Sequence, residues 1–346
     1  MQLLLRQADN RLEFSRVQLM LVESRNAAAS VPAESIAHRN RKASLATFID
    51  LFCGIGGFHY AAESLGLRCV FASEIDENAC LQYEHNFGHR PEGDITKIET
   101  SRIPDHDILF GGFPCQPFSI IGKQDGFADR RGTLIYEIVR ILKGKKPHAF
   151  VLENVKQIVS NNEGGTMRAI LSALSAAGYD CDMRVLNALD YGLPQKRERA
   201  IIVGFRKGLE APFSWPERKR NYKPLAKILE TNPDQRHYVS EYIRERRKAS
   251  HSSPETPSIW HENKGGNVSS HPFSCALRAG ASYNYLLVNG ERRLTPREQL
   301  RLQGFPERFE IIGSDSQIRK QTGNAVPVPM IRAVIKEVLR AAGQSA

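Results

Sequence analysis

Short apolar runs alternate with segments of helical periodicity between residues 47 and 205, and this alternation restricts the fold more than any other feature. Between the runs, apolar residues recur every three or four positions, as they do on a helix that packs against a sheet. The runs that we interpret as strands are Thr47–Phe52, Cys69–Glu74, Asp107–Phe110, Ala149–Leu152 and Ala200–Phe205. This order predicts an α/β fold, with a mostly parallel sheet that carries helices on both faces.

A glycine-rich turn, Gly54-Ile55-Gly56-Gly57, follows the first run and precedes a helical segment. Such turns bind nucleotide cofactors, although an isolated one is equally often a tight connection. The third glycine of a dinucleotide fingerprint would fall at His59, which argues against a nicotinamide oxidoreductase. Glu74 ends the second run and is placed to accept hydrogen bonds from a ribose, and Asp94 could bind an adenine amino group. An adenosine cofactor without a pyrophosphate, such as S-adenosylmethionine, fits this pattern.

The third run leads into Phe113-Pro114-Cys115-Gln116-Pro117, which two glycines precede. Proline and glycine exclude both helix and ladder here, so Cys115 lies at the apex of a tight loop. Open α/β sheets place their chemistry at the carboxyl ends of strands, which favours a reactive thiol. The alternative is an inert buried cysteine, the usual state of a free cysteine.

Two further sites carry charge near strand ends. Glu153 ends the fourth run, where an isolated Glu-Asn pair would more often cap a helix. Arg197 and Arg199 precede the fifth run at positions i and i+2, so in an extended backbone both side chains point to one face. A solvated run of charges is the alternative for these two arginines.

Taken together, five motifs in order resemble the DNA (cytosine-5) methyltransferases: F-x-D-L-F-C-G-x-G-G, G-F-P-C-Q-P-F-S, L-E-N-V, Q-K-R-E-R and Q-T-G-N-A-V-P-V-P. The likeness runs from about Thr47 to the final helical segment and is strongest to the compact bacterial enzymes of type II restriction–modification systems. It implies a Rossmann-like fold dependent on S-adenosylmethionine, which donates a methyl group to C5 of cytosine.

The resemblance also implies roles for the charged and nucleophilic residues. Cys115 would add as a thiolate to C6 of a flipped-out cytosine and make C5 nucleophilic. Glu153, protonated or sharing a proton, would bond N3, while Arg197 and Arg199 would hold the cytosine carbonyl and the acidic residues.

Contacts to the cofactor and to DNA follow from the same motifs. We expect the cofactor to contact Phe52, Gly54, Ile55, Gly56, Gly57, Glu74, Ile75, Asp94, Pro114, Leu134 and Asn324. Ile75 departs from relatives that carry an aromatic residue there. For DNA, we expect contacts from Gln116, Ser119, Ile121, Lys123, Arg130, Arg131, Gly265, Gly266 and Asn267. The Gly265–Asn267 match is the weakest, and a plain surface turn is its alternative.

Composition supports a nucleic-acid partner. A net charge of +10 and a pI near 9.4 favour a polyanion, with double-stranded DNA as the expected substrate. The six cysteines include no C-x-x-C pair, so we expect reduced thiols and no metal site. No run of 18 apolar residues predicts a membrane span. We expect a cytoplasmic, nucleoid-associated monomer, with a cognate restriction endonuclease as a possible separate partner.

The resemblance also suggests how the chain is divided. Residues 1–46 would be an extension and linker, residues 47–205 and 310–346 the catalytic domain, and residues 206–309 a target-recognition domain. Two other functions share most of the motifs: a tRNA cytosine-5 methyltransferase and a catalytically silent DNA-binding regulator. The long basic segment after residue 206 argues against the first, and the intact Cys115, Glu153 and Arg199 argue against the second.

Overall fold

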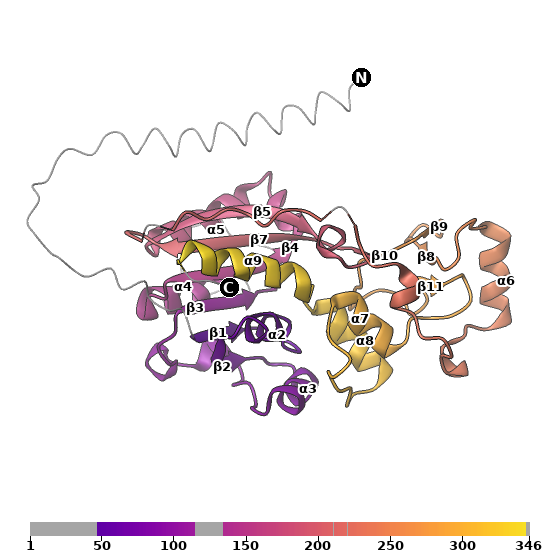
Figure 1. Ribbon diagram of the computed structural model, residues 1–346, viewed down its shortest axis with the longest axis horizontal. Coiled ribbons are helices and arrows are strands. Elements are labelled where there is room, and N and C mark those ends of the chain that lie inside the picture. The colour runs from indigo at the N-terminus through magenta and orange to yellow at the C-terminus, as the bar shows by residue number, and fades with distance from the viewer. Residues whose placement is uncertain (1–46, 115–133, 210, 220, 344–346) are drawn as a thin grey trace, which may run out of the picture. The chain divides into compact units, whose positions relative to one another are not determined.

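A computed structural model describes residues 47–114, 134–209, 211–219 and 221–343, which are built around a six-stranded sheet (Figure 1). The strand order is β2-β1-β3-β4-β7-β5. The strands are β1 (Thr47–Leu51), β2 (Arg68–Ser73), β3 (Ile108–Gly112), β4 (Ala149–Val155), β5 (Tyr179–Asn187) and β7 (Glu198–Arg206). The first four are parallel to one another, and β7 is antiparallel to both of its neighbours. The expected α/β fold with a mostly parallel sheet is confirmed.

Helices cover both faces of the sheet. Successive strand residues point to opposite faces, so each strand contributes side chains to both layers of the core. Phe48 and Val151 pack with helices α2 and α9, whereas Ile49 and Phe150 pack with α4 and α5. All four side chains are fully buried. The helices are α2 (Gly57–Glu63), α4 (Leu134–Lys145), α5 (Gly165–Ala176) and α9 (Val328–Ala341). This two-sided burial explains why the central strands read as continuous apolar runs.

Capping residues set the boundaries of two helices. Asp76 accepts a hydrogen bond from the Ala79 N–H and begins α3 (Glu77–Phe87), which ends at the left-handed Gly88. Thr295 begins α7 (Pro296–Gln303) through a capping box with Glu298.

The elements that were not predicted include two in the ranges expected to be catalytic. β5 alternates buried and exposed residues at the edge of the sheet, so it lacks the apolar run that marks the inner strands. The second is α8 (Asp315–Asn324), a helix of low apolar content. Its signal was nevertheless present, because Ser314 and Gln317 form a capping box.

The segment after residue 206, which lacks periodicity in the sequence, contains more regular structure than expected. Between residues 206 and 290 the described chain holds one α-helix, a three-stranded antiparallel sheet in the order β11-β8-β9, and β10, which pairs with β6 from the preceding region. These elements are α6 (Glu241–Ser250), β6 (Gln195–Lys196), β8 (Ile259–Glu262), β9 (Val268–His271), β10 (Ser274–Cys275) and β11 (Leu286–Val288). A separate apolar cluster, which includes Leu225, Ile259 and Leu286, packs them together. No described helix has the length and apolarity needed to cross a bilayer.

Candidate active site

A cavity of about 1200 Å³ lies at the carboxyl ends of the parallel strands. Its wall is formed by the residues that follow β1 to β4 and by the link between α8 and α9. β1 lies between β2 and β3, so the chain crosses from one side of β1 to the other at this edge. Open α/β sheets bind their ligands at such a switch point. The cavity exceeds the 300–1000 Å³ of common small-molecule sites, so it has room for more than one ligand.

Glu74 is fixed beside the glycine turn by backbone donors. One of its carboxylate oxygens accepts a 2.9 Å hydrogen bond from the Gly54 N–H, and the other accepts 2.8 Å bonds from the N–H groups of Ile75 and Asp76. A carboxylate has about four acceptor positions, so these three bonds leave capacity for a ligand hydroxyl. Gly54 itself has a φ of 53°, the left-handed region that glycine adopts without strain.

Ten of the eleven expected cofactor residues line this cavity. Gly56 is the exception among the described residues. Its φ is 83°, and a Cβ there would meet the Phe87 ring at 2.2 Å, so the position requires glycine for packing. Ile75 is 77% exposed although it lines the cavity, which leaves an uncovered apolar surface beside Glu74. Asp94 also lines the cavity and accepts bonds from the N–H and hydroxyl of Thr96.

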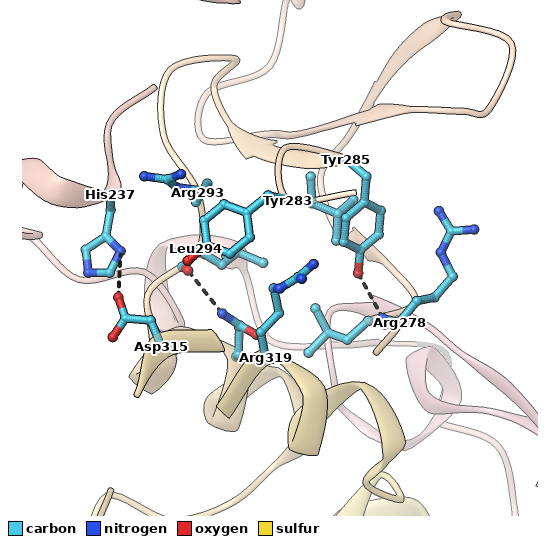
Figure 2. A pocket seen from close by; sticks show the side chains of 11 residues that line it. His237, Arg278, Tyr283, Tyr285, Arg293, Leu294, Asp315 and Arg319 are labelled. Atoms are coloured by element: carbon cyan, nitrogen blue, oxygen red, sulfur yellow. Dashed lines mark hydrogen bonds and ion pairs between the residues drawn. The ribbon is translucent and has the colours of Figure 1, made fainter. Parts of the chain in front are cut away.

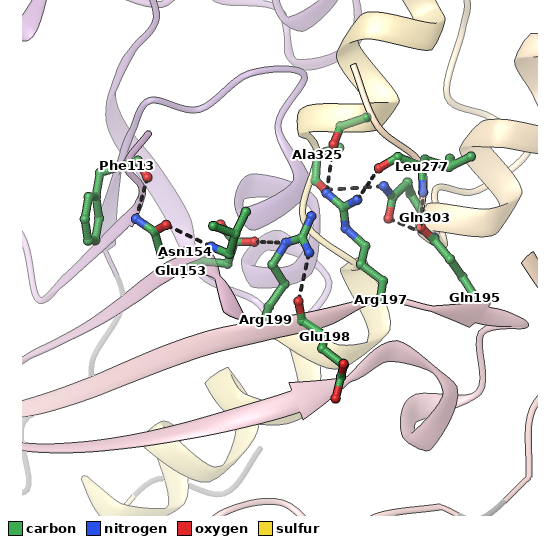
Figure 3. Close-up of polar contacts among 12 residues, drawn as sticks. Phe113, Glu153, Asn154, Gln195, Arg197, Glu198, Arg199, Leu277, Gln303 and Ala325 are labelled. Carbon is green, nitrogen blue, oxygen red and sulfur yellow. Dashed lines mark hydrogen bonds and ion pairs between the residues drawn. The ribbon is translucent and has the colours of Figure 1, made fainter. Parts of the chain in front are cut away.

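Glu153 and Arg199 form a buried ion pair in the cavity wall (Figure 3). The Arg199 Nε atom lies 2.7 Å from a carboxylate oxygen of Glu153, and the two side chains are only 12% and 9% exposed. β4 and β7 pair with Val155 opposite Arg199, so Arg199 is diagonal to Glu153 on one face of the sheet. A carboxylate and a guanidinium are therefore held together at a strand end, next to open space.

Arg197 also lines the cavity, but its guanidinium is engaged differently. It lies between β6 and β7 and donates hydrogen bonds of 2.7–2.9 Å to the carbonyls of Leu277, Gly323 and Ala325 (Figure 3). Its side chain is 1% exposed, and burial lowers its pKa. Arg197 thus joins two distant backbone segments, one that contains Leu277 and one that contains Gly323 and Ala325, a role that the i, i+2 spacing with Arg199 does not reveal.

Asn154 anchors the segment that leads to the expected nucleophile. Its side-chain amide donates a 2.9 Å bond to the Phe113 carbonyl, and its side-chain oxygen accepts from the Val155 N–H. The helix cap considered for the Glu-Asn pair is replaced by this link between β3 and β4. Pro114 lines the cavity and is the last described residue before the next gap. Outside the described residues lie Cys115, Gln116, Ser119, Ile121, Lys123, Arg130 and Arg131.

Sequence reasoning missed an ion pair at the cavity wall. The Lys320 ammonium lies 2.5 Å from the Asp76 carboxylate, and both residues line the cavity. Lys320 lowers the pKa of Asp76 through this contact. The helix-capping signal of Asp76 was visible in the sequence, but a partner 244 positions away had no local signature.

The Gly265–Asn267 turn joins β8 to β9 and does not line the cavity. Asn263 holds it by accepting bonds from the N–H groups of Gly265 and Asn267, and Gly266 has a φ of 80°. All three residues of the turn are exposed. The turn is therefore available for contact, and its role in binding DNA stays a prediction.

Among the described residues, one group of side chains could hold a metal ion. Ligand atoms of His59, Cys69 and His89 lie within 4.8 Å of one another. Burial raises the pKa of the Cys69 thiol to about 12, which opposes formation of the thiolate that a metal needs. His59 also stacks on Phe87 and hydrogen-bonds the Tyr83 hydroxyl. Aromatic packing accounts for this cluster.

Comparisons with known proteins agree with this geometry. A sequence model of the C-5 cytosine-specific DNA methylases matches residues 46–340. The chain is 55% identical to type II methyltransferase M.NgoBI of Neisseria gonorrhoeae over 83% of this chain and 91% of that protein. It is 53% identical to M.HaeII of Haemophilus aegyptius over 83% and 90%. A solved DNMT2 variant from Spodoptera frugiperda shares the fold, with a TM-score of 0.68, 21% identity, and coverage of 85% and 99%.

Proposed function

The chain belongs to the C-5 cytosine-specific DNA methylase family, and from this membership we propose how it acts. It methylates C5 of cytosine in DNA, and the relatives named type II methyltransferases place it among restriction–modification enzymes. We propose that the substrate is one short duplex site, whose target cytosine is flipped out of the stack into the cavity. The buried Glu153–Arg199 pair beside that cavity carries the proposal.

The residues of the cavity fit S-adenosylmethionine. Glu74 retains acceptor capacity for a ribose hydroxyl, Asp94 lines the same wall, and Ile75 offers an apolar surface to a purine. Phe52, Ile55, Pro114, Leu134 and Asn324 would complete the contact. When bound, this cofactor supplies an electrophilic methyl group on a sulfonium. Carboxylates in the cavity wall are compatible with that positive charge.

We propose that Cys115 forms a covalent bond to C6 of the cytosine. Thiolate addition at C6 moves electron density toward C5 and N3, so C5 becomes nucleophilic. Glu153 would bond N3 and stabilise that density, while Arg199 holds the Glu153 carboxyl in place. After methylation, loss of the C5 proton allows the ring to expel Cys115 and regain aromaticity. Arg197 would position this site through its three carbonyl contacts rather than touch the base.

We propose that different parts of the chain carry out different steps of this function. Residues 47–205 and 310–346 would hold cofactor and base, residues 206–309 would read the duplex, and residues 1–46 would be an extension. Gly265–Asn267 would contact the DNA, together with the residues around Cys115. The enzyme would act as a monomer on chromosomal DNA in the cytoplasm and protect it against a separate endonuclease.

The test is incubation with plasmid DNA and labelled S-adenosylmethionine, followed by base-resolution mapping of 5-methylcytosine. We expect label at one short motif for the wild type. Cys115→Ser should bind the same DNA but transfer no label, because serine is a much poorer nucleophile at neutral pH. Normal activity of Cys115→Ser would refute the covalent mechanism. Label in tRNA but not in plasmid would refute the DNA substrate.

A further inference from the structure

One tyrosine in the described chain lies between two arginines that belong to different elements. The guanidinium carbon of Arg293 lies 4.7 Å from the centre of the Tyr283 ring, and that of Arg319 lies 4.8 Å from it. Figure 2 shows the ring between the two side chains, in a pocket that Arg278 and Tyr285 also line. Stacking on an aromatic ring holds a guanidinium in a fixed plane.

The positive charge of this pocket is not neutralised within the described residues. Arg278, Arg293 and Arg319 form no salt bridge there, and the one acid that lines the pocket, Asp315, pairs with Arg236 and His237. Two guanidinium groups that stack on one ring repel each other, so this arrangement costs free energy in the protein without a bound anion. An anion bound beside these guanidinium groups would offset that repulsion.

Neighbouring arginines provide a contrast. Arg292 pairs with the buried Glu298, and Arg301 pairs with Glu307 in the same part of the fold. Acidic partners therefore occur close by, yet no described acidic side chain forms a salt bridge with Arg293 or Arg319.

The two guanidinium groups are positioned by backbone carbonyls and retain free donors. Arg319 donates through Nη1 to the Ala281 carbonyl at 2.8 Å, and Arg293 donates through Nη2 to the Arg236 carbonyl at 2.6 Å. The buried Nε of Arg319 has no partner among the described residues. The Nη donors that these bonds leave over could bind a tetrahedral oxyanion, whereas the buried Nε of Arg319 is out of reach of a ligand.

The pocket also adjoins the active-site cavity. Lys320, which follows Arg319 on α8, lines that cavity. Leu277 lines the pocket, and its carbonyl accepts the hydrogen bond from Arg197 in the cavity wall.

We propose that Arg293 and Arg319, at the rim of this pocket, bind the phosphate backbone of the substrate duplex, with Tyr283 as the platform on which both guanidinium groups stack. The proposal rests on the proposed DNA substrate. Phosphate contacts fix the register of a duplex but carry no base information. The pocket therefore contributes equally to the affinity for every DNA sequence, and other residues select the recognised DNA site.

The test is fluorescence anisotropy with a cognate and a scrambled duplex between 50 and 300 mM KCl, for wild type, Arg293→Gln, Arg319→Gln and the double variant. Loss of one phosphate contact should reduce the slope of log affinity against log salt by about 0.9 and weaken binding about tenfold for both duplexes. The turnover number at saturating DNA should stay within about twofold, because the pocket lies outside the reacting groups.

Arg168→Gln is the matched control. Arg168 is an exposed arginine on α5 without a salt bridge, so its loss changes the net charge equally. Tyr283→Phe should behave as wild type, and Tyr283→Ala should resemble the arginine variants. Cofactor affinity, measured by calorimetry, checks that each variant is folded.

Three results would overturn the proposal. The first is a double variant that matches Arg168→Gln in affinity and salt slope while wild type methylates DNA normally. The second is a loss confined to the cognate duplex, which would make these arginines base readers. The third is a wild type that neither binds nor methylates DNA, which would also remove the proposed function.

Discussion

At the scale of single residues, the proposed chemistry depends on the Glu153 carboxyl group, which is held by the Arg199 guanidinium. We predict that Glu153→Gln slows methyl transfer by roughly 10²–10⁴-fold, because an amide cannot share a proton with N3 of the base. Glu137→Gln is the control, since Glu137 lines the same cavity but pairs with Arg140. Single-turnover rates on a cognate duplex measure both. Equal rates for Glu153→Gln and Glu137→Gln would contradict the role of Glu153.

A second residue, His59, makes stability depend on pH. Burial, with a smaller contribution from the charge of His89, lowers the pKa of His59 to about 3. In the unfolded chain this histidine takes up a proton near pH 6.5. Below that pH the unfolded state therefore gains a proton that the folded state does not bind, so stability falls as the pH drops from 6.5 toward 3.

Urea unfolding at pH 7.5 and pH 5 tests this dependence. We expect His59 to account for a loss of about 2 kcal/mol between the two conditions. His59→Phe should lose correspondingly less over the same interval, even if its stability at pH 7.5 is lower. The same pH dependence in both proteins would show that His59 titrates normally when folded.

At the scale of elements, the capping box of α7 includes a buried ion pair. Glu298 is fully buried, accepts two bonds from Arg292 at 2.8 and 2.9 Å, and also accepts from the N–H groups of Thr295 and Glu230. We predict that Glu298→Gln lowers the free energy of unfolding by about 3–5 kcal/mol, because it leaves the Arg292 charge buried and uncompensated.

The control for that prediction is Glu307→Gln on the exposed pair with Arg301, which should cost less than about 1 kcal/mol. Urea denaturation of both variants measures the difference. Similar losses would mean that the burial of Glu298 has no energetic consequence.

Local signals explain which elements the sequence predicts. The Asp76 cap and the Thr295 capping box are formed by residues within three positions of each other, so they are readable in a linear sequence. β5 was missed because an edge strand alternates between polar and apolar residues. Glu74 and Glu153 could be placed in one site because the ends of parallel strands converge. The hydrogen bonds of Arg197 and the ion pair of Lys320 could not be predicted, since their partners are 80–128 and 244 positions away and only the folded chain brings them together.

At the scale of the whole molecule, the match to the family begins at residue 46. Every described residue of the cavity lies beyond that point. We predict that deleting residues 1–40 leaves the turnover number within about twofold, since no described contact of the site depends on them. Methylation of plasmid by the truncated protein checks this. A folded truncation that binds cofactor but transfers no methyl group would give the extension a catalytic role.

The three carbonyl contacts of Arg197 limit which segments could replace residues 206–309 of this chain. One of those carbonyls, that of Leu277, belongs to the segment that we propose reads DNA, and the other two border the cavity. New specificities could arise by exchange of that segment between relatives, but the incoming segment must present a carbonyl at the same place. A chimera that lacks this carbonyl would acquire a new recognition sequence, but the wall of its active-site cavity would be misplaced. An exchanged segment could therefore bring its specificity into this fold only if it preserves the contact with the Arg197 guanidinium.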